Sequence, residues 1–349
     1  MGSSVFYEVR TVSTFQVTVV GAGAIGGLFA AWLGNVSDPS LRLSVIARGA
    51  TLQAIQKYGL RFQQGETDRF IRVHATDDAS TLGPQDLIVV AVKGPALAQV
   101  AEIVRVLTGP KTQILVAMNG VPWWFFHGFG QQCEGLSLRT VDPHGAIAAA
   151  IPSSQVVGAV VHASAASPEP GVVRHVAGNG LIIGAAHGGA SNPLTSLAQR
   201  LQDSGWAVTV SEQIQRNIWY KLWGNMTMNP VSALTGVTCD RILDDPLVRG
   251  FCSAVMLEAQ TIGQHIGCAI DQNPEDRHSV TRKLGAFKTS MLQDLESGRT
   301  LEIDALVGAV QEIGRHLGLS TPNIDALLGL VRLLAQGRGL YPSVDSQST

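Results

Sequence analysis

A glycine-rich turn after a short apolar strand constrains the fold of this chain more than any other feature. Residues 16–20 form the strand and run directly into glycines with the spacing G-x-G-x-x-G. In this pattern the first glycine permits a tight turn, the second lets the backbone approach a pyrophosphate, and the third lets the next helix pack on the strand. The N–H groups at the start of that helix face the anion with the positive end of the helix dipole. The predicted dinucleotide-binding residues are Gly21, Gly23, Ala24, Ile25 and Gly26.

Two other interpretations of this turn remain open. The same glycine spacing also occurs in ordinary strand-to-helix turns that bind nothing. Residues 17–33 are almost free of polar groups, which also suits a signal or membrane segment. This stretch is interrupted by glycines, lacks a basic flank and is short for a membrane span, so a strand and a helix of a folded domain fit it better.

The composition favours a small-molecule partner. With 349 residues, 45% of them hydrophobic, the chain can bury a sizeable core and is expected to form two domains. Charged residues make up only 15% and the net charge is −2, so there is no electrostatic case for binding nucleic acid or an anionic membrane. The terminal segments 1–15 and 341–349 are predicted to be a disordered leader and tail.

The cysteines give no sign of a metal site. Cys133, Cys239, Cys252 and Cys268 stand apart, without a C-x-x-C pair or a Cys/His cluster at zinc spacing. They are predicted to be buried thiols of a reducing compartment, which favours a cytoplasmic protein.

The order of apolar segments predicts an α/β first domain. Near-continuous apolar runs at residues 41–47, 86–92 and 113–117 are typical of a parallel sheet that is covered on both faces. A hairpin is expected at residues 60–74, with Gly65 in its turn. The β-rich pattern continues at residues 156–161, 172–176, 181–183 and 206–210, with a helix near 193–203. We therefore expect a Rossmann-type, doubly wound sheet over residues 16–210.

The strand pattern ends near residue 211. Helical spacing dominates at residues 214–228, 247–266, 286–295 and 301–317. We therefore predict an all-helical C-terminal domain at residues 211–340. Residues 121–152, which include Trp123 and Trp124, fit neither pattern and are predicted to be a long loop with partial structure.

The end of the second strand indicates which dinucleotide binds. Sites that prefer NAD usually carry an acidic residue there, which accepts hydrogen bonds from the ribose 2′-hydroxyl. This strand ends Ile46-Ala47-Arg48, without a carboxylate, and a guanidinium suits a 2′-phosphate. We therefore predict NADPH as the cofactor. The alternative is that Arg48 is a solvated surface arginine.

A polar stripe on an apolar helix carries the strongest chemical signal of the second domain. Lys221, Asn225 and Asn229 are four residues apart and share one side of the predicted helix. Large apolar neighbours such as Trp219 and Trp223 argue against a fully solvated face, and a buried lysine needs a partner or a substrate. A plain surface stripe remains the alternative.

A further polar set occurs at residues 290–294 and 300–304. It contains Ser290, and it contains Glu302 two residues after Thr300. Taken alone, Glu302 is typical of an acid in the first turn of a helix that Thr300 caps.

Together, these segments resemble the ketopantoate reductase family, also called the 2-dehydropantoate 2-reductases. The resemblance covers most of the chain: the N-terminal glycine motif, residues 91–93 and 118–120, the lysine and asparagine helix ending in Pro230, and residues 290–294 followed by 302–304. Their joint order and spacing are specific to this family. The resemblance implies a Rossmann-type domain followed by a helical domain.

The resemblance also implies roles for individual residues. They are Lys221 and Glu302 for catalysis, Asn225, Asn229, Ser290 and Asn119 for substrate binding, and Lys93 and Asn119 for cofactor binding. The implied reaction is hydride transfer from NADPH to the ketone carbon of a 2-oxo acid while the Lys221 ammonium delivers a proton to the oxygen. The implied substrate is 2-dehydropantoate, reduced to pantoate in pantothenate and coenzyme A biosynthesis.

Other functions stay open at this stage. The loop at residues 121–152 is longer and more aromatic than the family pattern, so it could cover the nicotinamide end and admit a bulkier 2-oxo acid, or simply be a surface flap. A dinucleotide-binding sensor without turnover is the alternative from another class. Apolar helices of the second domain could also pack between two copies of the chain, which leaves a homodimer open.

Overall fold

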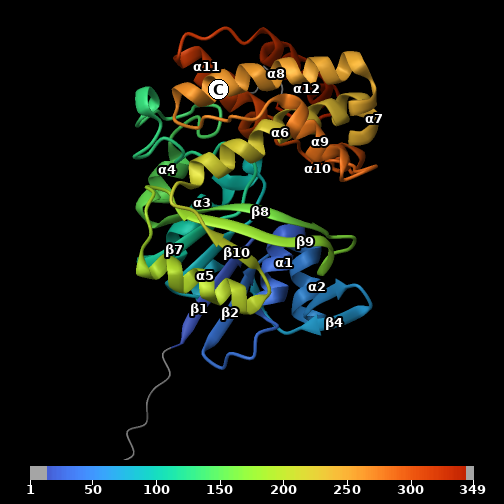
Figure 1. Cartoon of the computed structure of the whole chain (residues 1–349). Helices are drawn as coiled ribbons and strands as arrows, with labels where there is room; N and C mark the ends of the chain where they lie inside the picture. The colour runs from blue at the N-terminus through green and yellow to red at the C-terminus, as the bar shows by residue number, and fades with distance from the viewer. Residues whose placement is uncertain (1–13, 343–349) are drawn as a thin grey trace, which may run out of the picture.

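The computed structural model describes residues 14–342 and divides them between a sheet region and a helical region (Figure 1). The sheet region ends with β10 (Ala207–Val210), and the elements from α6 (Ile214–Thr235) to residue 342 are helices. Residues 1–13 and 343–349, with most of the predicted leader and tail, lie outside the described part. The predicted fold class, an α/β sheet domain followed by an all-helical domain, is confirmed.

The glycine turn follows a strand in the interior of the sheet. β1 (Phe15–Val20) pairs in parallel with β2 (Leu41–Ile46) on one side and with β6 (Gln85–Val90) on the other. The chain winds outward from β1 in one direction and from β6 in the other, so the end of β1 is a topological switch point, where α/β sheets bind ligands.

The sheet contains ten strands in the order β4-β3-β9-β8-β7-β6-β1-β2-β5, with β10 paired to β9. The other strands are β3 (Leu60–Gln64), β4 (Thr67–Ile71), β5 (His74–Thr76), β7 (Thr108–Val116), β8 (Val156–Ala166) and β9 (Val172–Ala185). β3 and β4 form the predicted hairpin, with Gly65 at a φ of 56° in its turn. The segments predicted at 172–176 and 181–183 are one long strand, β9.

Apolar residues on both faces of the central strands explain their near-continuous apolar sequence. In β6, Leu87 and Val89 face one core layer, whereas Ile88 and Val90 face the other. The first layer contains α1 (Ala24–Leu33), α2 (Gly49–Tyr58) and α5 (Asn192–Ser204). The second contains α3 (Leu97–Leu107) and extends into the helical region, so the two regions share a core.

The helical region is built around α6. This helix packs on α8 (Pro246–His265), α10 (Ser290–Glu296) and α12 (Pro322–Gly337), and on β8 below it (Figure 1). Because it is enclosed on most sides, its buried residues follow no single apolar stripe. The other helices are α7 (Cys239–Asp244), α9 (Pro274–Arg282), a π-helical segment (Asp304–Gly308) and α11 (Ala309–His316).

The helices of the second region differ from the prediction in their starts and in their number. α10 begins at Ser290 rather than at residue 286, because the Thr289 hydroxyl caps it by accepting from the Leu292 N–H. The helix predicted from residue 301 begins with the π-helical segment at Asp304. α12 was missed.

The aromatic residues of the loop at 121–152 are part of the core. Trp123, Trp124, Phe125 and Phe126 are all less than 5% exposed. The Phe125 ring lies 6.1 Å from the Trp219 ring of α6. These side chains therefore hold the loop and its short helix α4 (Ala146–Ala150) against the molecule. Within residues 14–342, no helix is long and apolar enough to cross a membrane.

Candidate active site

The glycine turn has the shape that a pyrophosphate requires. Gly21 has a φ of 100°, and a Cβ at Gly26 would lie 1.8 Å from the Gly21 carbonyl oxygen, so both positions need glycine. A Cβ at Gly23 would meet nothing within 4 Å. Gly23 therefore does not serve internal packing; it leaves open space at the N-terminus of α1, where Ala24 and Ile25 begin a helix without an acidic first turn. This geometry fits a bound phosphate.

Arg48 lies where the second strand meets its helix. It is the residue that precedes α2, it has an extended backbone, and its side chain is exposed. An exposed guanidinium at the carboxyl end of β2 is accessible to a nucleotide.

Lys221 is held by two partners from the first region. Its Nζ donates to Asn119 Oδ1 at 3.0 Å and to the carbonyl oxygen of Val161 in β8 at 2.9 Å. Burial lowers the pKa of Lys221 to about 8, against the opposing charge of Glu302. The lysine thus comes from the second region but points into the junction with the first.

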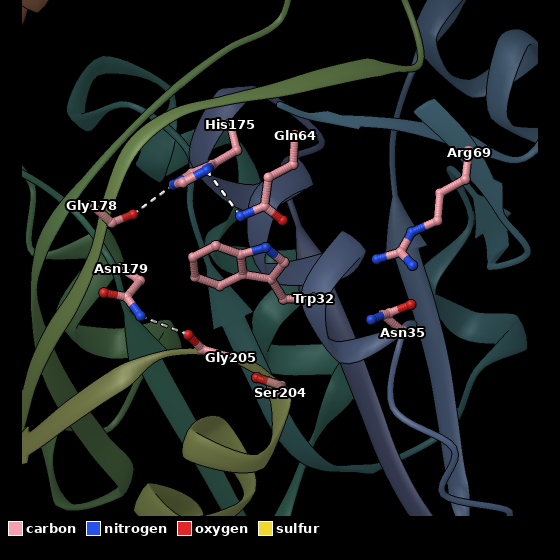
Figure 2. A pocket seen from close by; sticks show the side chains of 9 residues that line it. All are labelled: Trp32, Asn35, Gln64, Arg69, His175, Gly178, Asn179, Ser204 and Gly205. Carbon is pink, nitrogen blue, oxygen red and sulfur yellow. Dashed lines mark hydrogen bonds between the residues drawn. The ribbon is translucent and has the colours of Figure 1, made fainter. Parts of the chain in front are cut away.

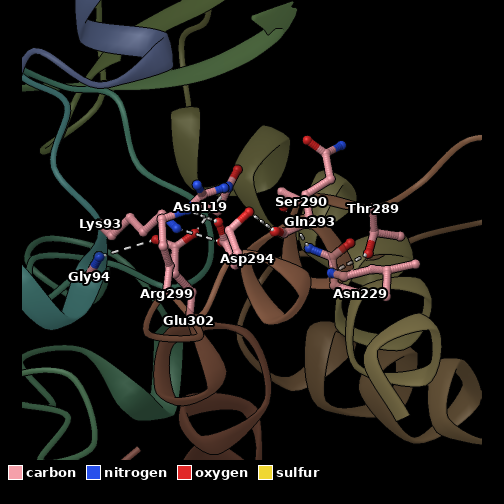
Figure 3. Close-up of polar contacts among 12 residues, drawn as sticks. Lys93, Gly94, Asn119, Asn229, Thr289, Ser290, Gln293, Asp294, Arg299 and Glu302 are labelled. Atoms are coloured by element: carbon pink, nitrogen blue, oxygen red, sulfur yellow. Dashed lines mark hydrogen bonds and ion pairs between the residues drawn. The ribbon is translucent and has the colours of Figure 1, made fainter. Parts of the chain in front are cut away.

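Glu302 is linked to Lys221 through the Asn119 side chain. Its Oε1 accepts from the Gly94 N–H at 3.1 Å, and its Oε2 accepts from Asn119 Nδ2 at 3.4 Å (Figure 3). Burial raises the pKa of Glu302, whereas the Gly94 hydrogen bond favours its ionised form. The carboxylate is therefore turned toward the first region. The alternative of a first-turn acid is not what the structure shows, because the helical segment begins after it.

An ion pair that the sequence analysis did not assign joins the two regions. Lys93 Nζ lies 2.5 Å from Asp294 Oδ2, and Arg299 Nε lies 2.9 Å from Asp294 Oδ1 (Figure 3). Asp294 is only 6% exposed. The sequence showed Asp294 as an acid within the predicted helix at 286–295. Its partner Lys93 is 201 positions earlier, so the spacing gave no sign of the pair.

The predicted substrate-binding residues of the second region follow Lys221 along α6. Asn225 is half-buried one turn later, and Asn229 Nδ2 lies 3.5 Å from Ser290 Oγ, at the limit of a hydrogen bond. Ser290 is exposed at the start of α10. A hydrogen bond between the hydroxyls of Thr289 and Ser232 connects this end of α10 to α6. Lys221, Asn119 and Glu302 are thus joined by direct contacts, and Glu302 also accepts from the backbone N–H of Gly94, the residue after Lys93. Asn225 and Asn229 extend this line along α6.

A pocket lies away from these residues. It measures about 390 Å³ and is lined by Trp32, Arg69, His175 and their neighbours (Figure 2). Trp32 belongs to the last turn of α1, whereas the glycine turn lies at the other end of that helix. None of the predicted site residues lines the pocket. Across residues 14–342, no group of three or more His, Cys, Asp or Glu side chains is placed to hold a metal ion.

The fold and the site define a class of protein. A doubly wound sheet whose first strand ends in a G-x-G-x-x-G turn, followed by a helical domain that supplies a buried lysine, is typical of NAD(P)H-dependent reductases. The family models described as "Ketopantoate reductase PanE/ApbA" and "Ketopantoate reductase PanE/ApbA C terminal" match residues 17–188 and 213–335. The chain belongs to the ketopantoate reductase family, as predicted, and is an oxidoreductase that acts on CH–OH groups.

Relatives cover nearly the whole chain. It is 44% identical to a 2-dehydropantoate 2-reductase of Mesorhizobium japonicum over 93% of this chain and 99% of that one. A crystal structure of a family member from Ralstonia solanacearum MolK2 is 56% identical, with a TM-score of 0.90 over 94% of this chain and 100% of that one. A structure of a dimeric ketopantoate reductase from Staphylococcus aureus shares the fold at 23% identity, with a TM-score of 0.71 over 93% and 100% of the two chains.

Proposed function

We propose that this protein reduces 2-dehydropantoate to pantoate with NADPH, as a step of pantothenate and coenzyme A biosynthesis. The observation that carries the proposal is the contact chain from Lys221 through Asn119 to Glu302, which lies between the two regions. In this proposal residues 16–210 bind the cofactor, and residues 211–340 supply the substrate-binding and catalytic groups.

Lys221 is the proton donor in this mechanism. When bound, the reduced nicotinamide supplies the hydride to the ketone carbon of the 2-oxo acid. The Lys221 ammonium stabilises the negative charge that develops on the ketone oxygen and then transfers a proton to it. A pKa of about 8 suits this role, because the amine is mostly protonated at neutral pH and yet acidic enough to release the proton.

Asn119 and Glu302 hold the donor in place. The Asn119 carbonyl oxygen accepts from Lys221 while its amide donates to Glu302, so the side-chain orientation is fixed at both ends. The negative charge of Glu302 raises the pKa of Lys221 and thereby favours the protonated donor.

Neutral hydrogen-bonding groups line the remaining substrate positions. Asn225, Asn229 and Ser290 are assigned to hydrogen bonds with the polar groups of the substrate, which they can make without the desolvation cost of more charges. Lys93 is assigned to the cofactor side, next to the Gly94 N–H that contacts Glu302. The open space at Gly23 supports the assignment of Gly21 to Gly26 to the pyrophosphate.

Arg48 supports NADPH over NADH. A charge-assisted pair with the 2′-phosphate contributes roughly 1.5–3 kcal/mol, or about 10- to 150-fold in affinity. We expect Arg48→Ala to remove most of the preference for NADPH, measured as the ratio of kcat/KM values for the two cofactors. An unchanged ratio would show that Arg48 is a solvated arginine.

The assembly and location are part of the same proposal. We infer a homodimer, since apolar side chains such as Leu247 and Leu333 are exposed on α8 and α12 and the Staphylococcus aureus relative is described as dimeric. A cytoplasmic location follows from the buried free thiols Cys239, Cys252 and Cys268.

The direct test is NADPH oxidation with a panel of 2-oxo acids that includes 2-dehydropantoate. Turnover with 2-dehydropantoate at the highest kcat/KM supports the proposal. A higher value for a bulkier 2-oxo acid would assign the protein to a different reductase. Tight NADPH binding without turnover of any member of the panel would indicate a sensor.

A further inference from the structure

Arg277 lies against α6 beside Lys221. It projects from α9, and a Cβ built on Gly224 would lie 2.7 Å from Arg277 Nε and 2.9 Å from its Nη2. The guanidinium therefore rests directly on the backbone of α6, three residues beyond Lys221. Its Cζ also lies 5.3 Å from the centre of the Tyr220 ring, a cation–π distance. Gly224 makes this close approach feasible, because any larger residue would displace the guanidinium.

Arg277 has no acidic partner in the described part of the chain. None of the ion pairs formed by residues 14–342 includes it, and its buried Nε has no hydrogen-bond acceptor. The other cations near the site differ, since Lys93 and Arg299 share Asp294. A partly buried guanidinium without a counter-charge is unfavourable unless a ligand supplies one.

The positive charge of Arg277 acts on Lys221 and on His162. Burial is the main cause of the lowered pKa of Lys221, and Arg277 lowers it further. Arg277 also contributes to the lowered pKa of His162, after burial and Lys221. His162 follows Val161, whose carbonyl oxygen binds Lys221. The guanidinium, which rests on α6 at Gly224, is therefore near Lys221 and near the part of β8 that Lys221 contacts.

We propose that Arg277 binds the carboxylate of the 2-oxo acid substrate. This inference rests on the proposed function and assigns the anionic end of its substrate. A carboxylate supplies the missing counter-charge, and it can accept two parallel N–H bonds from one guanidinium. Three residues of α6 separate Lys221 from Gly224, about 4.5 Å along the helix axis. A small 2-oxo acid, whose carboxylate and ketone are on adjacent carbons, can therefore reach Arg277 and Lys221 together.

The test compares Arg277→Gln and Arg277→Lys with the control Lys283→Gln. Lys283 caps the same helix, is exposed and forms no ion pair among the described residues, so its variant removes one charge without touching α6. The probe is oxamate, an isostere of pyruvate whose amide carbonyl is a poor hydride acceptor, and oxamide is its uncharged counterpart. Binding to the protein with NADPH is measured by calorimetry, and NADPH oxidation is measured with the best 2-oxo acid.

We expect Arg277→Gln to weaken oxamate binding and raise the KM of the 2-oxo acid by about 10- to 150-fold, with NADPH affinity unchanged. Arg277→Lys should recover part of the loss, because it keeps the charge but not the two-bond geometry. Lys283→Gln should match the wild type, and oxamide binding should not respond to any of the three changes.

Two results would overturn the assignment. One is oxamate binding to Arg277→Gln as tight as to the wild type. The other is an equal loss of NADPH binding, which would place Arg277 at the cofactor instead. If Arg277→Gln does not fold, Arg277→Lys alone decides, since it must then bind oxamate more weakly than the wild type. A wild type that binds oxamate through Arg277 but reduces no 2-oxo acid would contradict the proposed function and not the carboxylate site.

Discussion

The cofactor turn and the Lys221 site are built in opposite ways. The turn is closed by residues 21–26 and the ends of neighbouring strands, and its geometry depends on backbone sterics alone. The Lys221 site joins residues 102 and 183 positions apart through side chains from both regions. A short sequence pattern therefore specifies the first, whereas the second exists only when the two regions dock. The comparison implies that changes in the turn should act on cofactor binding, and changes at Lys221 on turnover.

Lys221→Ala gives the largest expected effect. Loss of the proton donor should lower kcat by about 10²- to 10⁴-fold, while the NADPH dissociation constant stays near its wild-type value. Steady-state kinetics and fluorescence titration of NADPH measure the two quantities. Lys221→Arg is the matched control, since it keeps the charge but is too weak an acid to replace the lysine. An equal loss of NADPH binding in both variants would contradict the expectation that changes at Lys221 act on turnover and not on cofactor binding.

The glycines of the turn allow a matched pair of substitutions. The Cβ of Gly23→Ala would meet no atom within 4 Å, so this substitution should leave the melting temperature unchanged. It should weaken NADPH binding by about 5- to 150-fold, because the methyl group would overpack against the phosphate. Gly26→Ala would press a Cβ against the Gly21 carbonyl oxygen and should lower the melting temperature as well. NADPH binding to Gly23→Ala at wild-type strength would mean that no phosphate approaches this position.

The fold and the turn could be predicted because their signals are local. The apolar strands, the hairpin at Gly65 and the glycine spacing each act over a few residues, and each depends on sterics or burial that any sequence of this kind obeys. The change from strands to helices was also visible in the sequence, because the period of the apolar residues changes near residue 211 and the last strand, β10, ends at Val210.

The partners of the site residues could not be predicted in this way. The sequence suggested Lys221 and Glu302, but that Asn119 lies between them depends on how α6 and the segment before Asp304 pack on the sheet. Arg277 and Asp294 were missed for the same reason: each looks like an ordinary charged residue of a short helix, and only the packed structure shows what each side chain contacts. The aromatic loop was also ambiguous, since burial of Trp124 is a property of the assembled core.

The pH dependence of turnover should follow Lys221. Its lowered pKa of about 8 means that kcat/KM stays level below this pH and falls about tenfold per unit above it, as the amine loses its proton. Stability should respond in the opposite direction. The unfolded lysine still holds its proton between about pH 8 and its ordinary value of 10.5, so this group makes folding more favourable as the pH rises through that window. The difference in unfolding free energy between the wild type and Lys221→Met isolates this contribution. A kcat/KM that stays level beyond pH 9 would remove Lys221 as the acid.

Asp294→Asn gives the smallest effect, because it acts on the link between the two regions and not on either site. The change leaves Lys93 and Arg299 without their shared carboxylate, but both cations are partly exposed, so the loss is about 1 kcal/mol or less. If Lys93 contacts the cofactor, its release should raise the KM of NADPH by up to about fivefold and leave the KM of the 2-oxo acid nearly unchanged. Arg299→Gln is the control, since it keeps the bond between Lys93 and Asp294, and should alter neither KM. A change confined to the KM of the 2-oxo acid would instead assign the Lys93 and Asp294 pair to the substrate side of the junction.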